Sequence, residues 1–331
     1  MCVKKNEYIL VTGGLGYIGS HAVIELLNKK KNVIVIDNLS NSKKNIISKI
    51  KKITKKKFIF YKADIRAKSL IKIFLRHKIK SVIHFAGLKS VSESEKRIHK
   101  YIENNYFGTL NLINIMNKFN CRKIIFSSSA CVYYEKNKLP FKENSKIKPN
   151  SNYGLTKYAV ELLLKKFVKF DRKDWSVIIL RYFNPIGCHP SGLIGENPNK
   201  IENIIPNIVN AIKQNKVFKI YGGNYNTPDG TCYRDYIHVS DLVRAHVLAL
   251  KKFKKKSYEI INIGTGAPYS VKELITEFSK KLKKKIKFKI VKRRVGDIAV
   301  SYACSKKSYK KLGWKPLNNI DIMCRDIIKT I

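Results

Sequence analysis

The sequence predicts an α/β fold: a doubly wound parallel sheet followed by a smaller α+β domain. In the N-terminal half, short apolar strands alternate with amphipathic helices, the pattern of a parallel sheet covered on both faces. Several strand candidates end in glycine or polar clusters, where open α/β sheets place their ligands. After about Arg181 the chain changes to loops rich in proline, glycine and asparagine. We therefore expect a first domain over residues 1–180 and a second over 181–331, with some segments of the second returning to the first.

The strand candidates of the first domain are short apolar runs. In chain order they are YILVTG, NVIVID, FIFYKAD, SVIHFAG, KIIFSSS and SVIILRYFN. Within the second domain, EIINIGTGAPYSVKELITEFSKKL predicts one more strand, a glycine turn and a helix that begins with a capping box of Ser270 and Glu273.

The composition excludes several classes of protein. Hydrophobic residues make up 44% of the 331 residues, and no apolar run approaches the ~20 residues of a membrane-spanning helix. The N-terminus lacks the apolar stretch of a signal peptide, and seven cysteines are scattered singly without a CxxC pair. The histidines show no metal-ligand spacing. We expect a cytoplasmic protein without a membrane association, a disulfide framework or a metal site.

The charge balance is strongly basic, with 68 Lys and Arg against 23 Asp and Glu and a net charge of +45. Nucleic-acid binding is one interpretation, because lysines neutralise phosphates. However, the lysine runs fall at expected helix ends and turns throughout the chain, and no nucleic-acid-binding motif accompanies them. We interpret the charge as lysine-rich composition that favours an anionic small substrate, and we expect no sequence-specific nucleic-acid binding.

The segment YILVTGGLGYIGSH predicts a dinucleotide site. Gly13, Gly16 and Gly19 directly follow a strand and precede a helix, where glycine permits a tight turn and close approach to a pyrophosphate. The next strand ends at Asp37, whose carboxylate can accept both hydroxyls of an adenosine ribose and repels a 2′-phosphate, so a Rossmann-type domain with NAD rather than NADP is favoured. Asp64, which closes the third strand, can reach the adenine amino group or serve as an ordinary helix N-cap.

Tyr153 and Lys157 are spaced i, i+4, so they share one face of the helix that YGLTKYAVELLLKKF predicts. Tyrosine has a reference pKa of about 10, which leaves roughly 0.1% phenolate at pH 7. A nearby ammonium and a positive nicotinamide ring lower that pKa, and Ser129 at the end of the preceding strand can share the substrate proton. Although YxxxK is common in helices, its combination with the glycine turn and the serine strand predicts a general base, its activator and a proton relay.

The chain is similar from end to end to the extended short-chain dehydrogenase/reductase family, and within it to the UDP-hexose 4-epimerases. The matching segments are VTGGLGYIGSH, DNLSNSKK, ADIR, VIHFAGLKSVSES, ENNYFGTLNL, FSSSACVY, YGLTK, LRYFNPIGCHPSG, DGTCYRDYIHV and RRVGD. The resemblance implies reversible epimerisation at C4 of UDP-galactose and UDP-glucose by transient hydride transfer to bound NAD. It leaves open whether the N-acetyl sugars are accepted.

The resemblance also implies which residues form the site. Catalysis would use Tyr153, Lys157 and Ser129. Cofactor contacts are implied at Gly13, Gly16, Tyr17, Ile18, Gly19, Asp37, Asn38, Asp64, Ile65, Phe85, Ala86, Lys89, Asn105, Lys157 and Tyr182. Contacts with the UDP-sugar are implied at Ser129, Tyr153, Asn184, Arg234, Arg294, Asp297 and Ser301, where the two arginines can hold the diphosphate with forked donors. A homodimer is implied through the helices KYIENNYFGTLNLINIMNKF and YGLTKYAVELLLKKFVKF.

Some positions depart from the family pattern. Tyr134 stands where a glycine usually follows VY, which we expect to alter a turn, and Cys304 and Lys306 depart from the pattern after the GD loop. Two other functions stay open. A nucleotide-sugar 4,6-dehydratase shares the fold, but its acidic pair would stand where SSA does. A noncatalytic NAD-sensing module usually lacks the tyrosine, which is present here.

Overall fold

The computed structural model describes residues 6–171, 173–198, 201–294 and 296–331. The chain forms two compact units, each built from several stretches of sequence. The first comprises Met1–Val132, Ile147–Arg181 and Val243–Ile261, and the second comprises Tyr133–Lys146, Tyr182–Leu242 and Asn262–Ile331.

A seven-stranded sheet forms the centre of the first unit, with the order β10-β6-β5-β4-β1-β2-β3. The strands are β1 (Glu7–Thr12), β2 (Val33–Asp37), β3 (Ile59–Lys62), β4 (Lys78–His84), β5 (Lys123–Ser129), β6 (Ser176–Tyr182) and β10 (Ser257–Ile263). Neighbouring strands from β3 to β5 pair in parallel. This order reverses between β1 and β4, which is the switch point of a doubly wound sheet, and the predicted fold class is confirmed.

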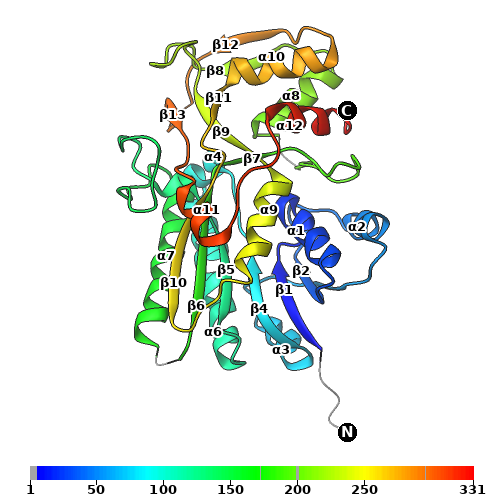
Figure 1. Ribbon diagram of the computed structural model, residues 1–331, viewed down its shortest axis with the longest axis vertical. Coiled ribbons are helices and arrows are strands. Elements are labelled where there is room, and N and C mark those ends of the chain that lie inside the picture. Colours follow the sequence, from blue (N-terminus) through cyan, green and yellow to red (C-terminus); the bar gives the residue numbers. More distant parts are fainter. Residues whose placement is uncertain (1–5, 172, 199–200, 295) are drawn as a thin grey trace. The chain divides into compact units, whose positions relative to one another are not determined.

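Helices flank this sheet (Figure 1). They are α1 (Tyr17–Asn28), α2 (Ile46–Thr54), α3 (Ile71–Arg76), α4 (Val91–Lys96), α5 (Ile98–Tyr101), α6 (Gly108–Lys118) and α7 (Asn152–Phe170). Side chains of α3, α6 and α7, such as Phe74, Leu112 and Leu164, pack in one buried cluster with alternate residues of the strands. Val11 and Val35 lie between these alternate residues and are fully buried too. The strands are therefore apolar on both faces, as parallel strands are.

The strand EIINIG corrects an expectation. We expected it in the second domain, but β10 is an edge of the seven-stranded sheet. The reason is packing: Tyr258 and Ile260 lie against the core of the first unit, and Ser257 N–H donates to the Trp175 carbonyl at 3.0 Å. The helix expected over residues 100–119 is a continuous run of α5, η2 (Ile102–Phe107) and α6, and η2 is a π-helical turn. Such turns are frequent at functional sites.

The second unit contains two small sheets. In one, β9 (Tyr233–His238) pairs with β7 (Asn184–Ile186), β11 (Pro268–Ser270) and β13 (Val300–Ser301), and in the other β8 (Phe218–Tyr221) pairs with β12 (Phe288–Val291). The remaining helices of this unit are α8 (Ile204–Lys213), α10 (Val271–Leu282), α11 (Lys306–Leu312) and α12 (Ile320–Ile328), while α9 (Val239–Ala249) begins in this unit and belongs to the first from Val243. The predicted capping box is confirmed, because Ser270 Oγ accepts from Glu273 N–H and Glu273 accepts from Ser270 N–H.

Two further findings concern the helices and the cysteines of the described residues. Within those residues, none of the helices has the length and apolar character that crossing a membrane requires. Six cysteines are free thiols, namely Cys121, Cys131, Cys188, Cys232, Cys304 and Cys324, whereas Cys2 lies outside the described residues.

Candidate active site

The three glycines after β1 have different structural reasons. Gly13 has a φ of +65°, and a Cβ there would lie 2.8 Å from the Ala86 backbone nitrogen. A Cβ on Gly19 would lie 2.1 Å from the Gly13 carbonyl oxygen, so both positions require glycine for the chain's own packing. Gly16 is the N-cap of α1, makes no side-chain cap, and a Cβ there would meet only Gly13 O, at 3.2 Å. Its missing side chain leaves space in front of the first turn of α1, which contains Tyr17 and Ile18.

Asp37 ends β2 and is held tightly. Its Oδ2 accepts from Leu15 N–H at 3.0 Å, and its Oδ1 accepts from Leu39 N–H at 2.9 Å and from Ser42 Oγ at 2.8 Å. A carboxylate has about four acceptor positions, so about one remains for a ribose hydroxyl. The sequence suggested that Asp37 receives both hydroxyls, but with these partners in place it has room for about one.

Asn38 and Asp64 come together beside Asp37. Asn38 Nδ2 donates to Asp64 Oδ2 at 2.9 Å, and Arg66 donates through Nε and Nη2 to both oxygens of the same carboxylate. These hydrogen bonds, above all those from Arg66, hold the pKa of Asp64 well below its ordinary value. The helix N-cap alternative is wrong, because the next helical turn begins at Lys68 with Ala67 as its N-cap.

The loop after β4 is fixed by Asn105 of η2. Asn105 Oδ1 accepts from Leu88 N–H at 2.8 Å, while its Nδ2 donates to the Leu88 carbonyl at 3.0 Å and to Thr156 Oγ1 at 3.2 Å. Most of its hydrogen-bonding capacity therefore orients this loop. The other predicted contacts here are partly buried Phe85 and Ala86, exposed Lys89, and buried Ile65.

Tyr153 and Lys157 lie in the first two turns of α7. Ser151 caps this helix by accepting from Gly154 N–H at 3.1 Å, so Tyr153 is held where the helix begins. A Cβ on Gly154 would lie 2.4 Å from the Cys131 carbonyl oxygen, so this glycine allows α7 to approach the end of β5 closely. Lys157 Nζ lies 5.8 Å from the centroid of the Tyr153 ring. Tyr153 is 7% exposed and Lys157 is 5% exposed.

The three consecutive serines at the end of β5 have three different roles. Ser127 accepts from Lys157 Nζ through its carbonyl at 2.9 Å, which orients the ammonium. Ser128 Oγ donates to Glu161 Oε1, and Ser129 Oγ accepts from Cys131 N–H at 3.2 Å. Ser127 Oγ is hydrogen-bonded with His246 Nε2 at 2.9 Å, whereas Ser129 Oγ accepts from Cys131 N–H and so keeps its hydroxyl hydrogen for another acceptor. Ser129 ends β5 before the turn on which Gly154 packs.

Glu161 and Arg181 form a fully buried ion pair that sequence reasoning missed. Arg181 Nε donates to Glu161 Oε1 at 2.9 Å, and the side chains are 2% and 1% exposed. Burial lowers the pKa of Lys157 to about 8, and the Glu161 carboxylate one turn further along α7 opposes that shift. A charged residue inside the apolar strand SVIILRYFN was the available signal, because buried charges are paired.

In the second unit, three predicted residues lie together. Arg234 Nη2 is 3.3 Å from Asp297 Oδ1, and Ser301 pairs in register with Arg234 between β13 and β9. The Arg294 guanidinium stacks on the Tyr221 ring at 3.9 Å. Partly buried Tyr182 ends β6, and Asn184, also partly buried, begins β7.

The departures from the family pattern do not disrupt the local fold. Tyr134 N–H donates to the Lys146 carbonyl at 2.9 Å, and Lys146 Nζ lies 5.1 Å from the Tyr134 ring. Cys304 N–H donates to the Phe141 carbonyl at 2.9 Å. Both residues therefore contribute to ordinary loop contacts in the second unit.

A doubly wound sheet with a glycine turn at its switch point, and with tyrosine and lysine on a helix beside a serine-ended strand, defines the extended short-chain dehydrogenase/reductase class. The model of the NAD dependent epimerase/dehydratase family matches residues 9–264. The chain belongs to this family, and the resemblance seen in the sequence is confirmed.

Individual relatives are similar to this protein over nearly the whole length of its chain. A UDP-glucose 4-epimerase of Dictyostelium discoideum is 46% identical over 98% of this chain and 95% of its own length. The UDP-glucose 4-epimerase from Bifidobacterium longum, solved in complex with NAD+ and UDP, has a TM-score of 0.94 at 41% identity and covers 98% of this chain and 97% of its own. The UDP-Glc/GlcNAc 4-epimerase from Campylobacter jejuni has a TM-score of 0.83 at 31% identity, over 98% and 99%.

Proposed function

We propose that this protein is an NAD-dependent epimerase that inverts C4 of UDP-hexoses and so interconverts UDP-galactose and UDP-glucose. The observation that carries the proposal is the buried Tyr153 and Lys157 pair on α7, in a chain that shares 46% identity with a UDP-glucose 4-epimerase. The residues of the first unit fit a dinucleotide, because Gly16 leaves the start of α1 open and Asp37 keeps about one acceptor position. We assign NAD to the first unit and the UDP part of the substrate to the second.

The chemistry follows from the residues around Tyr153. NAD, when bound, supplies a reversible hydride acceptor for C4, so no net oxidation occurs. Tyr153 as phenolate removes the proton from the 4-hydroxyl, and the Lys157 ammonium stabilises that phenolate. Ser129 Oγ donates a hydrogen bond to the same substrate oxygen. Tyr153 would hold this proton and return it to the 4-oxygen, which together with the reversible hydride chemistry that NAD would supply would complete the inversion.

The decisive experiment is incubation of the purified protein with UDP-galactose, with chromatographic separation of the products. We expect UDP-glucose to form until the two sugars reach equilibrium. A 4-keto-6-deoxy sugar nucleotide would identify a 4,6-dehydratase instead, and complete recovery of UDP-galactose would identify a noncatalytic NAD-binding module.

The pH dependence of kcat should follow the protonation state of Lys157. Because burial lowers its pKa to about 8, the fraction of ammonium falls above that pH. We expect kcat to fall about tenfold per pH unit there. Stability should change in the opposite direction. Between pH about 8 and the ordinary pKa of 10.5, the unfolded chain binds more protons at this lysine than the folded chain does. Lys157 therefore makes the free energy of unfolding rise with pH in this range. A kcat that stays constant up to pH 10 would contradict the role of Lys157.

Acceptance of N-acetyl sugars is our second proposal, and it depends on Ser301. This side chain lies beside Arg234 and is small, so it would take less of the space for a 2-substituent than a bulky aromatic side chain would. We expect the wild type to interconvert UDP-N-acetylglucosamine and its galacto epimer. Ser301→Tyr should lower kcat/KM for the N-acetyl pair alone, by the ~1–3 kcal/mol of an overfilled site. The unsubstituted pair is the internal control.

Two results would count against this pocket argument. If the wild type does not turn over the N-acetyl pair, Tyr302 or Tyr134 fills the space that Ser301 leaves, and the epimerase proposal itself survives. If Ser301→Tyr slows both sugar pairs equally, the position does not discriminate at the 2-substituent.

We also propose a homodimer through α7 and the run of α5, η2 and α6, as the family resemblance implies. Leu155 and Leu162 are 50% and 42% exposed and lie seven residues apart on one face of α7, and Phe107 at the end of η2 is 54% exposed. Apolar side chains in such positions support an interface. Sedimentation equilibrium at micromolar concentration should give twice the chain mass, and a monomer would reject the proposal.

A further inference from the structure

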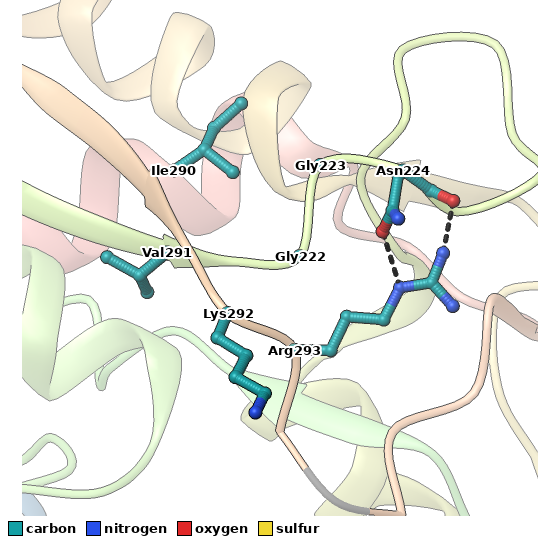
Figure 2. A pocket seen from close by; sticks show the side chains of 7 residues that line it. All are labelled: Gly222, Gly223, Asn224, Ile290, Val291, Lys292 and Arg293. Atoms are coloured by element: carbon teal, nitrogen blue, oxygen red, sulfur yellow. Dashed lines mark hydrogen bonds between the residues drawn. The ribbon is translucent and has the colours of Figure 1, made fainter.

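Two consecutive arginines, Arg293 and Arg294, shortly follow β12 and stack on two tyrosines that flank the turn after β8. The guanidinium carbon of Arg293 lies 4.0 Å from the Tyr225 ring centroid, and that of Arg294 lies 3.9 Å from the Tyr221 ring centroid. Figure 2 shows the hollow at this place. Its lining residues are Gly222, Gly223, Asn224, Ile290, Val291, Lys292 and Arg293.

Arg293 directs its donors into this turn. Its Nε donates to Asn224 Oδ1 at 2.7 Å, and its Nη2 donates to the Asn224 backbone carbonyl, as the dashed lines in Figure 2 show. A planar guanidinium can make two such bonds and stack on a ring at once, which an ammonium cannot do. We call Arg293, Asn224 and Tyr225 together the Arg293 cluster.

The backbone of the turn is shaped for this contact. Gly222 has a φ of +82°, and a Cβ there would lie 2.8 Å from Cγ of Arg293 and 2.4 Å from Cε2 of Tyr225. Gly222 N–H donates to the Val291 carbonyl at 2.8 Å, which joins the ends of β8 and β12. A side chain at position 222 would therefore displace the arginine from the ring.

The segment after Arg293 carries two predicted contacts for UDP. Asp297 N–H donates to the Arg294 carbonyl at 3.3 Å, and the Asp297 carboxylate pairs with Arg234 of β9. Arg294 is thus attached to β8 through its stack on Tyr221, and Asp297 is attached to β9 through Arg234. Releasing Arg293 from Asn224 would leave Arg294 held by its own stack on Tyr221 alone, and so less firmly placed.

We propose that Arg293 is a positioning residue for the UDP-sugar site, because its bonds to Asn224 and its stack on Tyr225 hold Arg294 and Asp297 in place for the nucleotide. This inference rests on the proposed function. It predicts an effect on UDP binding and not on the chemical step, since every residue involved lies in the second unit and the proposed base, Tyr153, lies in the first.

The test compares Arg293→Met and Arg293→Lys with the control Lys292→Met. Lys292 lines the same hollow, but its side chain points away from Asn224 in Figure 2. The measurements are Kd for UDP by calorimetry, KM and kcat with UDP-galactose, and NAD content. We expect both Arg293 variants to raise Kd and KM about tenfold, with kcat and NAD content within about twofold of wild type, and the control to match the wild type.

Different results would overturn the inference. If Arg293→Lys binds UDP as the wild type does while Arg293→Met binds it weakly, the positive charge alone accounts for the effect. An equal loss of UDP affinity in Lys292→Met would lead to the same conclusion. A fall in kcat with an unchanged Kd for UDP would also reject the positioning role of Arg293. If Arg293→Met fails to fold, Arg293→Lys decides, because it keeps the charge and most of the stem. A wild type that binds UDP but forms no UDP-glucose would contradict the proposed function, while the UDP affinities would still decide the role of Arg293.

Discussion

Tyr153→Phe should abolish turnover of UDP-galactose and leave the amount of bound NAD unchanged. The substitution removes the ionisable oxygen and almost no volume at a position that is 7% exposed. General base catalysis contributes about 10²- to 10⁴-fold, so we expect kcat to fall about 10³-fold. Because the backbone N–H of Tyr153 donates to Ser94 Oγ at 3.0 Å and the ring stays in place, α7 should begin as it does in the wild type.

Single-turnover and steady-state assays on protein of measured NAD content would check this result. The matched control is Tyr158→Phe, five residues further along α7 and one residue beyond Lys157, which should leave kcat within about twofold. Turnover by Tyr153→Phe at the wild-type rate would exclude Tyr153 as the base. Loss of NAD from this variant would mean that the hydroxyl serves cofactor binding and not proton transfer.

Gly19→Ala should prevent NAD binding and destabilise the fold. Its new Cβ would lie 2.1 Å from the Gly13 carbonyl oxygen and 2.8 Å from Cα of Gly14, and backbone atoms cannot rotate away as a side chain can. α1 would have to move from the turn after β1, which opens the place where a pyrophosphate would meet the helix. Overpacking of this kind typically costs about 1–3 kcal/mol, and we expect the upper end here.

Gly16→Ala is the informative partner of that variant. Its Cβ would meet only Gly13 O, at 3.2 Å, so the Tm should stay close to that of the wild type. The methyl group would nevertheless occupy the space in front of the helix, and we expect NAD affinity to fall about tenfold, or about 1.4 kcal/mol. Thermal unfolding and NAD content separate the two effects. Full NAD content and an unchanged Tm in Gly19→Ala would contradict the packing argument, and unchanged NAD affinity in Gly16→Ala would contradict the proposed approach of the phosphate.

Several features of the site followed from local sequence. The spacing of Tyr153 and Lys157 needs only a helix to bring both residues to one face, and Gly13 to Gly19 need only a strand, a turn and a helix. Nothing local indicated how the loop after β4 is held. Asn105 lies seventeen positions along the chain from Leu88, and its hydrogen bonds to that residue form only when η2 packs beside the loop.

By itself, the sequence determined the doubly wound fold and the family, and it indicated the residues that we propose to carry chemistry, because each depends on short patterns of apolar residues, glycines and helical spacing. Tertiary structure decided where β10 pairs, since strand partners are chosen by the core that covers Tyr258 and Ile260. It also decided that Ser128 meets Glu161 and that Glu161 meets Arg181, across 33 and 20 positions of chain. Such contacts depend on how separate elements pack, and burial then makes their pairing obligatory, because a charge without a partner is costly away from water.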